Sequence, residues 1–319
     1  MLSSDGRSPS RREFLGRTLR AGLPLMAGSA VAAAEIDPRP VVVTATSDRS
    51  VDSLIGHPSL LRELIGDALA RLTGTDTAAD AWNRLLAPDE VIGVKFNQSG
   101  AYPFQTTAPM ARALTESLTS AGFKPEQIVL IEVPSQLARS LKTRPPEIGW
   151  SATTTDFGSG QDQLARVLDQ VTGLINVPFL KTHNIAGMTG CMKNLSHALV
   201  RHPARYHANG CLPFITDIVA IPAIRNKIKL NLMNALRAVW EAGPDVQTRY
   251  IFEPGALLLS TDPVATDSAG TDLIDRQRAE QKKPPIGGKE GLLALWRAAE
   301  SRKLGVADRD RIRRRQVRL

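Results

Sequence analysis

Short apolar runs alternate along the chain with longer segments whose apolar residues recur at helical spacing. The runs that predict strands are residues 41–44, 91–96, 128–133, 174–180, 228–232 and 256–260. The segments that predict helices are residues 58–72, 108–121, 161–171, 262–276 and 288–302. Because strands that alternate with helices usually form a parallel sheet, we expect an α/β fold. The sheet should be largely parallel and flanked by helices, in a single large domain or two intimate lobes.

The N-terminal segment carries paired arginines followed by an apolar pair, in the sequence SRREFLG at residues 10–16. Residues 21–34 are rich in alanine and glycine and end in three alanines, which suits peptidase cleavage. This order resembles a twin-arginine export signal; a disordered basic tail is the alternative. The resemblance implies that residues 1–34 are a signal peptide and that the twin-arginine translocase is a partner during export. It also implies that the protein reaches the periplasm already folded.

The apolar part of this signal is poorly suited to anchoring the protein in a membrane. A membrane-spanning helix needs about 20 apolar residues, and this segment is interrupted by Gly22, Pro24 and Gly28. We therefore expect no stable membrane span after cleavage. Residues 35–305 should then form the α/β domain, followed by a basic C-terminal tail at residues 306–319.

The formal net charge of +8 is concentrated at the two ends of the chain. Five arginines lie in residues 1–34 and six in residues 307–319, and the segment between is nearly neutral. Proteins that bind single-stranded nucleic acid interleave aromatic residues with basic ones, and the C-terminal arginines lack them. We therefore expect a frayed, solvated helix end there and no nucleic-acid partner.

Polar side chains stand where several of the predicted strands end. Lys95 and Asn97 close one strand, Glu132 closes the next, and Lys181 and His183 follow a third. In open α/β sheets, ligands gather beyond the carboxyl ends of the strands. We therefore expect these side chains, distant in sequence, to face one crevice.

Three pairs of residues in this region suit the capture of a small anionic ligand. Lys181 and His183 are two positions apart, so in an extended segment they face the same side. They are the candidate catalytic residues, although His183 could instead form a hydrogen bond in the crevice wall. Lys193 and Asn194 follow on a predicted helix and could bind phosphate or carboxylate, as could Lys95 and Asn97, or could serve in capping and solvation.

Four of the five histidines and both cysteines lie between residues 183 and 211. His197, His202 and His207 recur every five residues, which differs from the spacing of a zinc-binding helix, and Pro203 interrupts any helix there. A metal site made from this run alone is therefore not expected.

A divalent metal ion could instead be held by residues from different parts of the chain. The candidate ligands are His183 and His207 with Glu132 or Asp267. Alternatively, His183 acts as a general base without metal. Asp262 precedes Pro263 in the manner of a helix cap, and Asp267 could pair with a lysine or lie on a buried helix face.

The two cysteines, Cys191 and Cys211, are candidates for a disulfide in an oxidising compartment. Closing a loop of about 20 residues would contribute roughly 3 kcal/mol in the chain-entropy model. Free buried thiols and metal ligation are the alternatives. An iron–sulfur cluster is not expected, because such clusters usually take four cysteines.

Several of these segments together resemble the family of domains of unknown function numbered 362. The matching segments are VIGVKFN, LINVPFLKTH, GCMKNL, the later His207 and LLLSTDPVATD, in the family's order and within residues 91–269. Some members of that family carry ferredoxin modules, whose cysteines this chain lacks. Asn234 stands where the family often has an acidic residue. The family's name implies no activity.

No nucleophile elbow, HExxH motif, phosphate-binding glycine loop or dinucleotide fingerprint occurs in the sequence. The leading hypothesis is an exported, metal-assisted, hydrolase-like enzyme that acts on a small anionic substrate. The alternative from another class is a periplasmic protein that binds a metal, cofactor or carboxylate without turnover. A third interpretation makes the histidine-rich segment purely structural.

Overall fold

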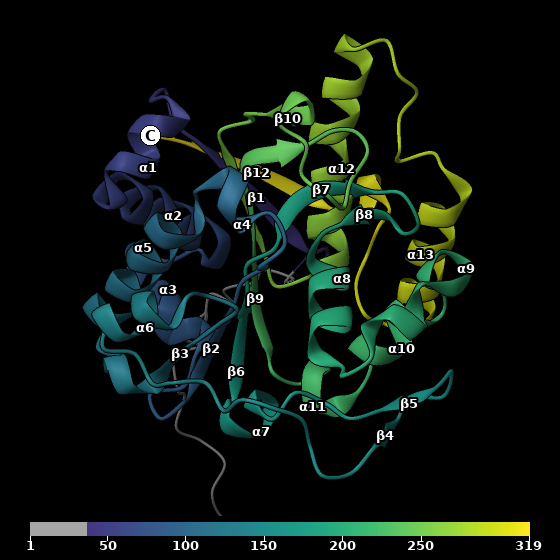
Figure 1. Cartoon of the computed structure of the whole chain (residues 1–319). Helices are drawn as coiled ribbons and strands as arrows, with labels where there is room; N and C mark the ends of the chain where they lie inside the picture. Colours follow the sequence, from purple (N-terminus) through teal and green to yellow (C-terminus); the bar gives the residue numbers. More distant parts are fainter. Residues whose placement is uncertain (1–36) are drawn as a thin grey trace, which may run out of the picture. The chain divides into compact units, whose positions relative to one another are not determined.

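A mixed β-sheet lies at the centre of the computed structural model, which describes residues 37–319 (Figure 1). The expected export signal lies outside the described residues. In this part of the chain the sheet has ten strands, and β4 (Thr155–Asp156) and β5 (Gln161–Asp162) pair separately. The strands of the sheet are β1 (Val41–Thr46), β2 (Ile92–Lys95), β3 (Ile128–Ile131), β6 (Gly173–Asn176), β7 (Phe179–His183), β8 (Gly187–Thr189), β9 (Ile228–Val239), β10 (Ile251–Phe252), β11 (Ala256–Ser260) and β12 (Arg313–Arg318).

The main path of the sheet runs β12-β1-β11-β9-β6-β2-β3. Its strands all run in one direction except β11, which is antiparallel to both β1 and β9. The shorter β7 pairs with β9 in parallel and forms a hairpin with β8. The prediction of a largely parallel sheet flanked by helices is confirmed, and residues Arg39–Leu319 form one compact unit.

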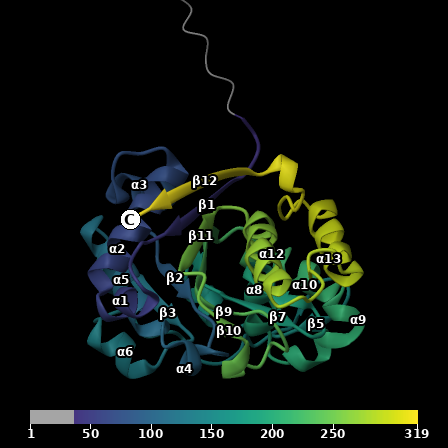
Figure 2. The ribbon, with the colours of Figure 1, turned by 90° about the horizontal axis from the view of Figure 1, so that it is seen from above.

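Helices cover both faces of the sheet (Figure 2). One face carries α1 (Val51–Gly56), α2 (Pro58–Thr73), α3 (Ala78–Leu85), α5 (Thr107–Ser120) and α6 (Ser135–Ser140). The other carries α8 (Cys191–Ser196), α10 (Phe214–Val219), α12 (Pro263–Glu280) and α13 (Glu290–Ser301). Shorter helical turns are α4 (Ala101–Phe104), α7 (Val167–Gln170), α9 (Ala208–Cys211) and α11 (Pro222–Arg225).

The period-two alternation of strand side chains divides the core into two layers. In β1, Val42 packs among the α8 and α12 side chains, whereas Val43 and Ala45 pack with α2 and α5. In β9, Met233 packs in the layer of α8 and α12, and Leu232 packs in the layer of α2 and α5. Because the central strands are buried on both sides, their sequences read as continuous apolar runs.

Most predicted elements are present with boundaries shifted by a few residues. The cap of α12 is as expected: the Asp262 carboxylate accepts a hydrogen bond from the Ala265 N–H at 2.8 Å, and Pro263 follows in the first turn. The apolar run at 174–180, however, is divided between β6 and β7. Lys181 and His183 therefore lie within β7 rather than after a strand.

The predicted helix at residues 161–171 is wrong except for its last turn, α7. The buried carboxylate of Asp162 accepts hydrogen bonds from the N–H groups of Gln163 and His202 and from the Tyr206 hydroxyl. Its Oδ1 also lies 2.9 Å from the His202 Nδ1. The long-range bonds to His202 and Tyr206 hold the segment extended and replace the helical ones.

The expectation of a basic tail with a frayed helix end at residues 306–319 is also wrong. Arg313–Arg318 form β12, which pairs in parallel with all of β1 at the edge of the sheet. The exposed residues Arg314, Gln316 and Arg318 alternate with half-buried ones along this strand. Charged side chains are common on edge strands because they oppose pairing with other chains. Within residues 37–319, no helix is both long and apolar enough to cross a bilayer.

Candidate functional site

A polar cavity of about 300 Å³ opens where β2 and β3 end. Its walls also include residues of β7, α8 and the 3-10 turns that follow α8. Seven of the residues predicted from the sequence line it together: Asn97, Glu132, Lys181, His183, Lys193, Asn194 and His207. The strand ends therefore converge on one crevice, as expected for an open α/β sheet.

Lys95 lies behind this cavity rather than in its wall. Its side chain is fully buried, and its Nζ donates hydrogen bonds to the Phe96 carbonyl at 2.6 Å and to Asn194 Oδ1 at 3.1 Å. The Nζ also pairs with Glu132 Oε2 at 3.2 Å. Burial lowers the pKa of Lys95, and the Glu132 carboxylate opposes that shift. Lys95 therefore positions Asn194 and Glu132 instead of contacting a ligand.

A chain of buried asparagines extends this support across the sheet. Asn194 Nδ2 donates to Asn176 Oδ1 at 2.8 Å, and Asn176 Nδ2 donates to Asn231 Oδ1 at 2.9 Å. Asn176 Nδ2 also reaches the Cys191 carbonyl at the start of α8, at 3.2 Å. Neither Asn176 nor Asn231 was predicted as a site residue from the sequence, although an asparagine within an apolar run was the available signal.

The backbone at Glu132 adopts a left-handed conformation, with φ at 61°. Such a conformation is uncommon outside glycine and is costly unless the surroundings impose it. Here the carboxylate pairs with Lys95 and accepts the Gln98 N–H at 2.9 Å. Glu132 therefore joins the loop after β2 to the end of β3 at the mouth of the cavity.

Two lysines supply positive charge to the cavity. Lys181 Nζ donates to both the carbonyl and the hydroxyl oxygen of Ser99, at 2.8 and 3.1 Å. Lys193 Nζ lies 3.2 Å from His207 Nε2, so that it can donate a hydrogen bond there. Burial lowers the pKa of each lysine to about 8. Both lysines are therefore mainly cationic at neutral pH, and each loses its proton as the pH rises through about 8.

The backbone fixes the tautomer of His183. Its Nδ1 accepts hydrogen bonds from the N–H groups of Ile185 and Ala186, each at 3.1 Å. A nitrogen that accepts these bonds carries no proton, so the neutral ring carries its proton on Nε2. Burial, followed by the positive charge of Lys193, lowers the pKa of His183 to about 3.

His183 therefore offers the cavity a hydrogen-bond donor. Its Nδ1 is already occupied by backbone donors, and its Nε2 is protonated. This arrangement argues against the expected roles of His183 as a metal ligand and as a general base, because each role needs a free lone pair.

His207 has the opposite tautomer. Its Nδ1 donates to the Pro203 carbonyl at 3.1 Å, since a carbonyl can only accept, and this leaves a lone pair on Nε2. Burial and the neighbouring Lys193 lower the pKa of His207. The His207 and His183 rings are stacked, with centroids 5.7 Å apart and planes 21° apart. The cavity thus holds a neutral donor and a neutral acceptor side by side.

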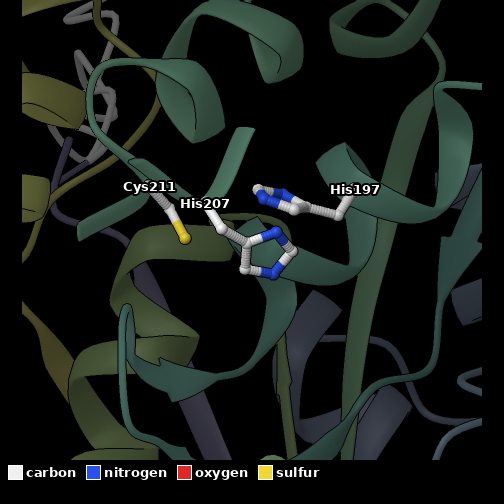
Figure 3. A group of neighbouring side chains, drawn as sticks. All are labelled: His197, His207 and Cys211. Atoms are coloured by element: carbon white, nitrogen blue, oxygen red, sulfur yellow. The ribbon is translucent and has the colours of Figure 1, made fainter. Parts of the chain in front are cut away.

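The potential metal-ligand group among the described residues consists of His197, His207 and Cys211. One ligand atom from each lies within 4.8 Å of the others. Figure 3 shows the His207 side chain between Cys211 and His197. His197 Nε2, however, donates to the Tyr206 carbonyl at 3.1 Å. His197 is not among the metal ligands predicted from the sequence.

Three of the expected metal ligands, His183, His207 and Glu132, line the same cavity, but among the described residues the expected set does not form a ligand group. Only His207 of that set belongs to the group that could hold an ion. Glu132 is paired with Lys95, and the Asp267 carboxylate caps α8 by accepting the N–H groups of Cys191 at 2.5 Å and Met192 at 3.0 Å. Burial raises the pKa of Asp267 to about 7, against the effect of these bonds.

This cap also explains the glycine before α8. A Cβ atom at Gly190 would lie 2.2 Å from Asp267 Oδ1, which is closer than real contacts allow. The expected disulfide between Cys191 and Cys211 is absent, and both are free buried thiols. The Cys191 thiol lies beside Asp267, whereas Cys211 lies beside the histidines, so the two sulfurs have different surroundings.

The fixed tautomer of His183 gives a direct prediction. Its imidazole should remain neutral with the proton on Nε2 between about pH 5 and 8, because both burial and Lys193 oppose a second proton. Nitrogen NMR of protein labelled in its histidines would measure this, with a His183→Gln variant to assign the signal. A doubly protonated ring, or a proton on Nδ1, within that range would contradict the assignment.

Comparison with known proteins adds family information for part of the chain. No curated protein matches the sequence. The matched segment of the family model contains β7, α8 and the histidines of the cavity, whereas Lys95, Asn97 and Glu132 precede it. Residues 154–272 match the family described as a domain of unknown function, DUF362.

Proposed function

We propose that this protein is an enzyme that binds a small anionic substrate in the polar cavity and acts on it by acid–base chemistry. The observation that carries the proposal is the stacked pair of His183 and His207. One ring is held as a donor and the other as an acceptor, between Lys181 and Lys193. A purely structural cluster has no need for opposite tautomers beside two buried cations.

The charge of the cavity favours an anion. Among the described residues that line it, Lys181 and Lys193 are cations, and the one carboxylate, Glu132, is neutralised by Lys95. The Asp245 carboxylate also acts on Lys181 and partly offsets its charge. His183 adds a neutral N–H donor. Ammonium groups and a ring N–H are suitable partners for carboxylate or phosphate oxygens. Partial burial strengthens these interactions relative to those in water.

Hydrolysis is the reaction that these groups support best. Lys193 Nζ lies 3.2 Å from Nε2 of His207, so a bound anion that draws the Lys193 ammonium to itself would free the lone pair of that nitrogen. Nε2 could then take a proton from a water molecule while the water oxygen attacks an acyl or phosphoryl centre. The negative charge that develops on the substrate oxygen would be stabilised by the Lys181 ammonium and the His183 N–H. The leaving group would then receive the proton from the His207 imidazolium.

Anion binding should depend on both lysines and on pH. We expect Lys181→Met and Lys193→Met to weaken the binding of inorganic phosphate or acetate by about 10- to 100-fold, the worth of a charge-assisted hydrogen bond. Because deprotonation removes their charge and the pKa of each lysine is about 8, affinity should be high below that pH and fall above it. Isothermal titration calorimetry would measure both effects.

The exposed Lys283 provides the matched control, since Lys283→Met removes the same charge away from the cavity. Equal weakening by all three substitutions would indicate a non-specific charge effect and contradict the proposed site. His207→Gln should leave anion binding largely intact and abolish turnover. If the wild-type protein binds anions but forms no product from pooled periplasmic metabolites, the alternative of a binding protein without turnover is favoured.

A metal-assisted reaction is the second candidate, favoured by the closeness of His197, His207 and Cys211. Two contacts oppose it. A cation at His207 Nε2 would have to displace the Lys193 ammonium, and His197 already donates its Nε2 proton to a carbonyl. Thiolate and imidazole ligands suit zinc.

Elemental analysis distinguishes the two candidates. We expect protein purified without chelators to contain no stoichiometric divalent metal, and Cys211→Ser to leave anion binding unchanged. Stoichiometric zinc that is lost in both Cys211→Ser and His207→Gln, with parallel loss of activity, would instead establish the metal-assisted reaction. Cys191→Ser serves as a control thiol, because Cys191 lies beside Asp267 and outside this group.

We further propose that the protein works in the periplasm after twin-arginine export. The support is the SRREFLG sequence and the alanine-rich segment that follows it. Replacing Arg11 and Arg12 together by lysine should retain the protein in the cytoplasm with its signal uncleaved, as measured by cell fractionation and mass spectrometry. Unchanged periplasmic recovery would contradict this proposal, and replacement of Arg17 and Arg20 by lysine is the matched control.

A further inference from the structure

A second cavity, of about 800 Å³, lies beside the anion cavity. Gln98 and Glu132 line both, so the two cavities adjoin at these residues. The second cavity is formed by α4, the start of α5, and the segment that leads from β3 into α6. Its volume is in the range of sites that take a whole small-molecule ligand.

The walls of the second cavity differ in character from those of the first. Six of its ten lining residues are apolar or aromatic, namely Ala101, Tyr102, Ala108, Val133, Pro134 and Leu137. Three others, Gln98, Gln105 and Thr107, are polar and uncharged. Among its lining residues in the described chain, Glu132 carries the one charge, and Lys95 neutralises it. The second cavity therefore has apolar side chains and no unpaired charge, whereas the adjoining first cavity is lined by two lysines.

Tyr102 marks the outer side of this apolar space. Its side chain is 89% exposed, which is unusual for a large aromatic residue. It stands on α4, next to a cavity whose walls also include the apolar side chains of Val133 and Leu137. Covering such a side chain with an apolar group would remove its surface from water.

We infer that the substrate is an amphiphilic anion, with a carboxylate or phosphate head in the first cavity and an aliphatic or aromatic group in the second. The inference rests on the proposed function and adds the class of substrate to it. The head meets Lys181, Lys193 and His183. The apolar group passes Gln98 and the neutralised Glu132 and lies against Tyr102 and Leu137.

Two homologous series of ligands test this inference. One comprises acetate, butyrate and octanoate, and the other comprises inorganic phosphate, butyl phosphate and octyl phosphate. Affinity should rise about fourfold for each methylene that is fully buried, and by less where burial is partial. The series that binds more tightly at equal chain length identifies the head group.

The location of the apolar group is tested by Ala108→Glu. Ala108 is exposed and is the second residue of α5, where a glutamate is compatible with the helix. The substitution puts bulk and negative charge into the second cavity. We expect octanoate to bind at least tenfold more weakly to this variant, with the affinity for acetate unchanged. Ala79→Glu is the matched control, at the second position of α3, and should change neither.

The outcomes separate this inference from the function on which it rests. If acetate or phosphate binds through Lys181 and Lys193 but chain length has no effect, the amphiphilic substrate is excluded and the anion site stands. If longer chains bind more tightly and Ala108→Glu makes no difference, the apolar group lies elsewhere and the assignment of the second cavity is wrong. If none of the probes binds, both proposals fail.

Discussion

The structure around the site depends on one buried polar chain that begins at Lys95. The Lys95 ammonium is fully buried between a carbonyl, the Asn194 amide and the Glu132 carboxylate. From Asn194 the chain continues through Asn176 to Asn231, so that β2, α8, β6 and β9 are joined by side-chain hydrogen bonds. A buried charge without partners is strongly destabilising, which makes the arrangement of these elements nearly obligatory.

This chain holds α8 in place, and α8 in turn presents Lys193 to the cavity. Asp267 supports the helix from the other side by accepting its first N–H groups, and Gly190 allows the close approach. Lys193 then meets His207, whose tautomer is fixed by a backbone carbonyl. Lys193 and His207 are therefore positioned largely by main-chain contacts and buried polar groups.

The charges of the side chains that line the cavity decide which kind of ligand it favours. Burial lowers the pKa of Lys181 and of Lys193 and keeps His183 neutral. A site with cations, a neutral donor and a neutral base suits an anionic substrate better than a divalent metal, because the cations would repel the metal. The adjoining second cavity and the exposed Tyr102 are the basis for proposing that the ligand also carries an apolar group.

The sequence by itself determined the α/β class, the α12 cap at Asp262 and the convergence of strand ends that brings Lys181 and His183 to the cavity. These features follow from local periodicity and from the shared direction of parallel strands. Tertiary structure alone decided the tautomer of His207, the capping role of Asp267, and the pairing of the C-terminal arginines in β12. Each depends on partners far away in sequence or on backbone groups whose positions no residue pattern encodes. The clustering of histidines in the sequence could therefore indicate where the candidate site lies. Only hydrogen-bond geometry could show that His183 presents an N–H donor and that His207 presents a nitrogen lone pair.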